Sequence, residues 1–129
     1  MDINAFTQKS QQVILAARQG AASRNHQQVT PAHLAEALLG QPDTIVLPLL
    51  ARLQVAPNDV AGPVRRHIEG IPQVYGGDAE IGFAPDSVAV LEAAEAEMRA
   101  MKDSYVSVEH LLIALTVSDE KIGEAFRDT

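Results

Sequence analysis

The side chains that could do chemistry in this chain are isolated histidines and carboxylates. The chain has four His, 17 Asp and Glu, and no Cys. Without Cys there is no thiolate metal site, cysteine nucleophile or disulfide framework. The sequence also lacks the phosphate loop G-x-x-x-x-G-K-[ST], the nucleophile elbow G-x-S-x-G and the zinc motif H-E-x-x-H. No catalytic residue and no metal ligand is therefore predicted.

Two histidines occupy matching positions and allow two interpretations. His33 and His110 each follow a hydroxyl residue, Thr30 or Ser107, by three positions. As a pair they could form a twofold metal or proton-relay site. Alternatively, each bonds locally in the first turn of a helix and packs between the two halves. The second interpretation is favoured, because no further His or carboxylate stands at ligand spacing. The other two, His26 and His67, are predicted to lie on the surface.

An internal repeat positions these residues. A shift of 77 residues aligns 6–39 with 83–116 without a gap, and ten of the 34 positions are identical. The composition predicts roughly two or three identities by chance. The identical residues recur at helical spacing, and this predicts two copies of a helical unit.

Capping residues locate the helices of each copy. Thr7 can begin a helix that runs to about Arg24, and Thr30–Pro31 can begin the next. Their counterparts are expected to start near Pro85 and after Ser107. Further helices are predicted over about 45–53, 57–69 and 119–127. Because proline lacks a backbone N–H, Pro63 predicts a kink or a late start near residue 64.

The predicted fold is all-α, with two pseudo-twofold-related four-helix repeats packed into one compact domain. A length of 129 residues suits one domain. Hydrophobic residues at 47% and charged residues at 21% are typical of globular chains. The domain is predicted to span 1–129, with repeat one at about 6–69, a Gly-containing linker at about 70–82 and repeat two at about 83–129.

Charge is concentrated in the second half of the chain. The net charge is −7, made up of +1 over residues 1–76 and −8 over residues 77–129. This sign disfavours nucleic acid as a partner. The acidic half is either a solvated face or a surface that attracts cationic segments. No signal-peptide pattern and no membrane-spanning apolar run are seen, so no membrane partner and a cytoplasmic location are expected.

Positions where the two copies differ are candidates for a function performed once. The differing pairs are Asp103 for His26, Glu109 for Ala32, Tyr105 for Gln28, and Thr7 against Ala84. The first three of these have a structural alternative. Asp103 could form a turn, Glu109 could stabilise a helix N-terminus, and Tyr105 could be half-buried packing.

Three segments resemble the doubled repeat of the Clp/Hsp100 amino-terminal domain. They are Phe-Thr-Gln-Lys-Ser at 6–10, Thr-Pro-Ala-His-Leu at 30–34 and Tyr-Val-Ser-Val-Glu-His-Leu-Leu at 105–112. The segment 71–76 is similar to the ClpB disaggregase branch. The resemblance implies the substrate-recruiting module of an AAA+ unfoldase, with a monomeric isolated domain and a homohexameric parent. ATP and Mg are then expected only in the ATPase modules, and this chain is expected to hold no cofactor and to be no enzyme.

The resemblance also implies a binding surface. In ClpB-like domains, substrate segments lie in an apolar groove edged by a threonine and two acids, which match Thr7, Asp103 and Glu109. Tyr105 and Leu91 are expected as groove contacts. The predicted partners are unfolded or aggregated polypeptides, and the alternative is an adaptor protein docked on a ClpC/ClpA-type domain. ClpC-type domains bind phosphoarginine through an acid in each repeat; Ala32 in the first repeat argues against such a twofold site.

Overall fold

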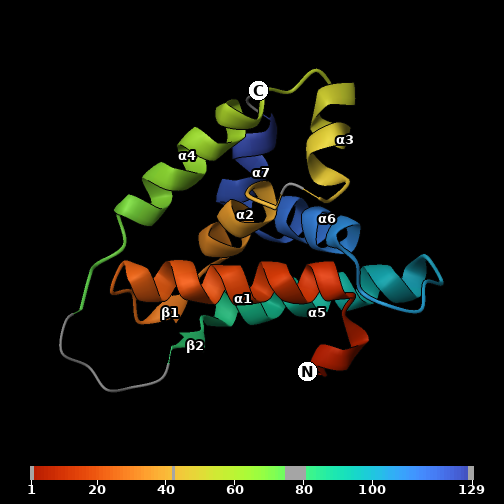
Figure 1. Cartoon of the computed structure of the whole chain (residues 1–129), viewed down its shortest axis with the longest axis horizontal. Helices are drawn as coiled ribbons and strands as arrows, with labels where there is room; N and C mark the ends of the chain where they lie inside the picture. The colour runs from red at the N-terminus through yellow and green to blue at the C-terminus, as the bar shows by residue number, and fades with distance from the viewer. Residues whose placement is uncertain (1, 42, 75–80, 128–129) are drawn as a thin grey trace.

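The computed structural model describes residues 2–41, 43–74 and 81–127. A short 3-10 helix, η1 (Ile3–Ala5), comes first. The α-helices of the described residues are α1 (Gln8–Ser23), α2 (Pro31–Leu39), α3 (Val46–Arg52), α4 (Pro57–Glu69), α5 (Pro85–Ala100), α6 (Val108–Ser118) and α7 (Glu120–Arg127). Two-residue strands, β1 (Gln28–Val29) and β2 (Gly82–Phe83), precede α2 and α5 (Figure 1). The predicted all-α class is confirmed.

The two repeats have matching helices. A shift of 77 residues carries both ends of α1 onto both ends of α5, and the first residue of α2 onto that of α6. The turn between the two helices contains a left-handed residue at the same position in each copy, Asn25 and Lys102, both with φ of 58°. Over the described residues the first repeat contains four α-helices and the second contains three, α5 to α7, where the sequence predicted four.

Each repeat pairs its N-terminal segment with a loop of the other repeat. Strands β1 and β2 are parallel, with Val29 opposite Phe83. At the equivalent place, Phe6 forms a parallel bridge with Val106. The backbone N–H of Thr7 donates to the Val106 carbonyl at 2.9 Å. Each repeat thus contributes its N-terminal segment to a pairing with the other repeat. This reciprocal exchange of segments interlocks the two repeats.

Two buried serines repeat this exchange with their side chains. The Ser10 hydroxyl donates to the Val106 carbonyl at 2.8 Å, and the Ser87 hydroxyl donates to the Val29 carbonyl at 2.6 Å. Both serines are 0% exposed. Because a buried hydroxyl needs a partner, these identical residues are explained by the pairing of the repeats.

One hydrophobic core joins both repeats. Its large side chains include equivalent pairs from α2 and α6, which are Leu34 with Leu111 and Leu38 with Leu115. Helix α4 packs on α2 and α7, and α5 packs on α6. None of the helices in the described ranges is both long and apolar enough to cross a bilayer.

Helix α4 has its predicted ends but not a late start. It begins at Pro57 and continues through Pro63 to Glu69, which are the predicted ends. Of the two effects predicted for Pro63, a kink or a late start near residue 64, the late start is wrong. Pro57 occupies the first turn, where no intrahelical N–H bond is lost. The buried stripe of Val60, Val64 and Ile68 holds the helix on both sides of Pro63. Packing of this stripe outweighs one missing hydrogen bond.

Candidate functional site

Thr7 lies where the two repeats meet. It is half-buried at the start of α1, and its hydroxyl oxygen accepts from the Ser10 N–H at 3.2 Å. Its own N–H bonds to the Val106 carbonyl. The exchange between repeats therefore brings Thr7 directly against the loop that precedes α6.

Two other predicted residues flank that loop. Tyr105 immediately precedes the fully buried Val106, but its own side chain is 57% exposed. This exposure does not support the interpretation of Tyr105 as half-buried packing. Glu109 is half-buried in the first turn of α6, where a carboxylate also stabilises the helix N-terminus. Thr7, Tyr105 and Glu109 are thus gathered around one backbone segment.

Asp103 is bonded to a buried histidine. Its Oδ2 lies 2.8 Å from Nε2 of His110, which is 1% exposed. The Ser107 N–H donates to Nδ1 of His110 at 2.8 Å, so the imidazole proton must be on Nε2 and is donated to Asp103. The Asp103 side chain is 46% exposed and can accept a further bond from a ligand. It has a structural role that the sequence did not predict.

The equivalent place in the first repeat contains two histidines. Nδ1 of His26 lies 2.9 Å from Nε2 of His33, and the Thr30 N–H donates to Nδ1 of His33 at 2.9 Å. The local hydrogen bonding predicted for His33 and His110 is confirmed, because each completes a capping box at its helix start. His26 is 4% exposed, so its predicted surface position is wrong. The turn folds it back onto His33.

Burial sets the charge state of this histidine pair. The pKa of His33 is lowered to about 4, first by desolvation and then by electrostatic repulsion from His26 and Arg24, against the opposing effect of Glu36. Burial also lowers the pKa of His26. Both imidazoles are therefore neutral at pH 7.

Leu91 does not reach the surface around Val106. It is 1% exposed and belongs to the core stripe of α5 with Val90 and Ala94. Its counterpart in α1, Ile14, is 9% exposed. The helical spacing of this stripe could have identified Leu91 as a core residue. Its predicted groove contact is not supported by this structure.

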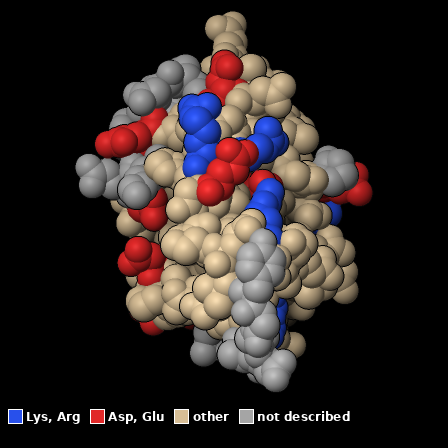
Figure 2. Space-filling view, turned by 90° about the vertical axis from the view of Figure 1, so that its left-hand side faces the viewer, with Lys and Arg blue, Asp and Glu red and all other residues tan. Residues whose placement is uncertain are grey.

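Charges of both signs alternate on the face shown in Figure 2, where Lys and Arg side chains lie beside Asp and Glu. Arg24 and Glu36 join α1 to α2 through two hydrogen bonds of 2.7 and 2.9 Å. Glu36 raises the pKa of Arg24 through this bond. The described residues contain no group of three or more His, Asp or Glu that could hold a metal ion.

A cavity elsewhere between the repeats was missed by the sequence analysis. It has a volume of about 450 Å³. Its lining residues come from separate parts of the chain, of which the first is Thr30 and the last is Ile122. Four separate chain segments contribute to it, so no local motif could indicate it.

Comparison with known proteins identifies relatives along nearly the whole chain. The family described as Clp repeat (R) N-terminal domain matches residues 5–129. The chaperone protein ClpB of Mycobacterium tuberculosis (strain H37Rv) is 32% identical over 124 residues, which cover 96% of this chain and 15% of that protein. The chain thus spans only about 15% of the length of the curated relatives it matches.

Solved structures share the fold. The Hsp104 N-terminal domain from Candida albicans superposes with a TM-score of 0.85 at 28% identity, over 95% of this chain and 80% of that one. A ClpV N-domain in complex with a VipB peptide superposes with a TM-score of 0.76 at 18% identity, over 97% of this chain and 79% of that one. The second likeness shows the fold alone.

Proposed function

The chain belongs to the family of Clp repeat N-terminal domains, and on this basis we propose that it recruits substrates for a ClpB-like AAA+ disaggregase. Its ligands are exposed apolar segments of unfolded or aggregated proteins. The ATPase modules, with their ATP and Mg, and a homohexameric assembly belong to the parent protein in this proposal. A cytoplasmic location stays a prediction.

One observation carries the proposal. The bond from the Thr7 N–H to the Val106 carbonyl places an edge of repeat one against the loop of repeat two that bears Asp103 and Tyr105. An exposed aromatic ring beside partly exposed carboxylates suits a polypeptide ligand. In this proposal the ring of Tyr105 packs against apolar side chains of the ligand. Asp103 and Glu109 accept hydrogen bonds from the ligand's peptide N–H groups or bind its flanking Lys and Arg residues.

Such a surface is tolerant of sequence. Unfolded chains differ in their side-chain order but share peptide groups and apolar residues, so the same contacts serve many clients. Affinity is modest, since a disordered segment loses conformational entropy when it binds. Weak binding also allows transfer of the client to a pore. The peptide bound by the ClpV N-domain supports a polypeptide as the class of ligand for this fold.

A titration of the ¹⁵N-labelled domain with a permanently unfolded protein, such as reduced and carboxymethylated lactalbumin, tests the proposal. Amide shifts are expected around Thr7, Tyr105 and Glu109. Tyr105→Ala and Glu109→Gln should weaken binding several-fold. Gln28→Ala is the matched control, because Gln28 is the exposed counterpart of Tyr105 in repeat one.

Two outcomes would contradict the proposal. Shifts confined to residues remote from Thr7, Asp103 and Glu109 would remove this surface from the binding site. Tight, saturable binding to one folded protein, without binding to unfolded clients, would instead favour the adaptor-docking domain of a ClpC/ClpA-type unfoldase.

A further inference from the structure

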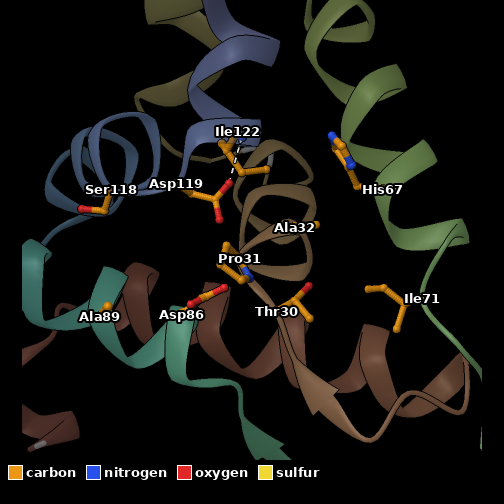
Figure 3. Close-up of a pocket in the computed structure, with 10 residues that line it drawn as sticks. All are labelled: Thr30, Pro31, Ala32, His67, Ile71, Asp86, Ala89, Ser118, Asp119 and Ile122. Carbon is orange, nitrogen blue, oxygen red and sulfur yellow. Dashed lines mark hydrogen bonds between the residues drawn. The ribbon is translucent and has the colours of Figure 1, made fainter.

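The cavity between the repeats is a separate feature from the surface around Thr7. None of its lining residues is Thr7, Asp103, Tyr105 or Glu109. The start of α2, the end of α4, the first turns of α5 and the junction of α6 with α7 surround it (Figure 3). Its volume of about 450 Å³ is within the range of small ligand sites.

The lining combines apolar side chains with two carboxylates and with the uncharged polar groups of Thr30 and Ser118. Pro31, Ile71 and Ile122 supply hydrocarbon surface, and Asp86 and Asp119 supply the acids. Figure 3 shows the two carboxylates to either side of Pro31, with Asp119 bonded to the backbone of Ile122. No Lys or Arg is among the lining residues, but the imidazole of His67, near the end of α4, also lines the cavity. A long basic side chain matches both features, because its methylenes pack on apolar groups and its charged end pairs with acids.

The pseudo-twofold repeat provides an internal comparison. A shift of 77 residues relates Asp86, in the first turn of α5, to Lys9, in the first turn of α1. The Lys9 ammonium donates to the Asp43 carbonyl in the loop between α2 and α3. At that place the chain therefore supplies its own cation to link a first turn with a loop. At the cavity the same position holds an acid, and the facing junction holds a second acid, Asp119.

We propose that this cavity binds the side chain of an arginine or lysine in an extended polypeptide. The charged end lies between Asp86 and Asp119, and the methylenes lie against Pro31, Ile71 and Ile122. The acidic second half of the chain, with a net charge of −8 over 77–129, favours approach of such a segment. The inference rests on the proposed function only in taking polypeptide as the ligand.

Two matched peptides test the inference on the whole chain. The first is a capped Ala-Leu-Arg-Leu-Ala peptide, and the second replaces Arg by citrulline, which has nearly the same shape without the charge. In ¹⁵N spectra the Arg peptide should shift the amides of Ala32, Ala89 and Ile122. The citrulline peptide should leave them unchanged, and added salt should weaken the Arg peptide's binding.

Substitutions then test whether Asp86 and Asp119 bind the charged end of the peptide's side chain. Asp86→Asn and Asp119→Asn should each weaken the Arg peptide at least about fivefold, which corresponds to roughly 1 kcal/mol. Asn keeps the helix-capping acceptor of Asp119. Glu92→Gln, an exposed acid of α5 that does not line the cavity, is the control and should have no effect.

The outcomes separate the two proposals. Equal binding of the citrulline peptide, or equal affinity of both Asn variants and the unsubstituted protein, would overturn the cavity inference. Shifts around Tyr105 and Glu109 without shifts at the cavity would overturn it while supporting the proposed function. Shifts at the cavity alone would support it and count against the Thr7 surface.

Discussion

Acidification should destabilise this fold through the buried pair of His26 and His33. Nδ1 of His33 accepts the Thr30 N–H, so protonating this nitrogen breaks the cap of α2. It also places a charge on a side chain that is only 1% exposed. The neighbouring charges are Arg24, which disfavours the imidazolium, and Glu36, which favours it. Burial has the largest effect on the pKa of His33, and it keeps the imidazole neutral.

The size of the effect follows from the pKa difference. The pKa of His33 is lowered from 6.5 to about 4 on folding, so the unfolded chain takes up the proton first. The stabilisation is thus present above pH 6.5 and is lost as the pH falls from 6.5 towards 4. Linkage gives a loss of about 2 kcal/mol by pH 5 and about 3 kcal/mol by pH 4.

Urea unfolding followed by circular dichroism between pH 7 and pH 4 measures this loss. His26→Asp is the informative variant, because it gives repeat one the Asp–His pair that repeat two contains. The new carboxylate should raise the pKa of His33 and abolish most of the loss between pH 6.5 and 5. His67→Gln, at an exposed position, is the control. Identical pH profiles for His26→Asp and the unsubstituted protein, or titration of His33 near pH 6.5 in the folded state, would refute the reasoning.

Four further substitutions can be measured by the same unfolding assay. Ser10→Ala and Ser87→Ala should each cost about 1 kcal/mol and should add in the double variant, since each removes one buried inter-repeat bond. Asp103→His keeps an acceptor for His110 but removes the carboxylate, so stability should change by less than about 1 kcal/mol while client affinity falls. Unfolding of that variant at neutral pH would show that the carboxylate itself is structural. Pro63→Ala should stabilise α4 by roughly 1 kcal/mol, and a destabilised variant would contradict its role as a helix defect.

Local signals were sufficient to predict most of the helices. Thr7, the pair Thr30–Pro31 and Ser107 mark three helix starts within a residue, because capping depends on the residues next to the helix end. Helix α4 has the ends predicted over 57–69, and only the late start suggested by Pro63 was wrong. The repeat itself was visible because the same packing and capping requirements act on both copies.

Contacts between distant residues could not be predicted from the sequence. Ser10 and Val106 are 96 positions apart. Each is identical to its counterpart in the other copy, but this identity did not indicate that the two residues bond across the repeats. His26 stands in a polar stretch that is typical of a surface loop, yet the left-handed residue Asn25 turns it back onto His33. The cavity has the same origin, since four separate segments must fold before its acids face one space.

The two capping histidines explain why position 26 and its counterpart, position 103, each hold a hydrogen-bond acceptor. Each uses Nδ1 to accept a backbone N–H, so each must donate from Nε2 and needs an acceptor seven residues earlier in the chain. Either a neutral imidazole or a carboxylate meets this need, and the chain uses His26 in one copy and Asp103 in the other. The fold therefore fixes an acceptor at this position without fixing its charge. The charge of this acceptor can therefore differ between the copies according to function. Repeat two exposes a carboxylate beside Tyr105, and repeat one buries a neutral pair of histidines.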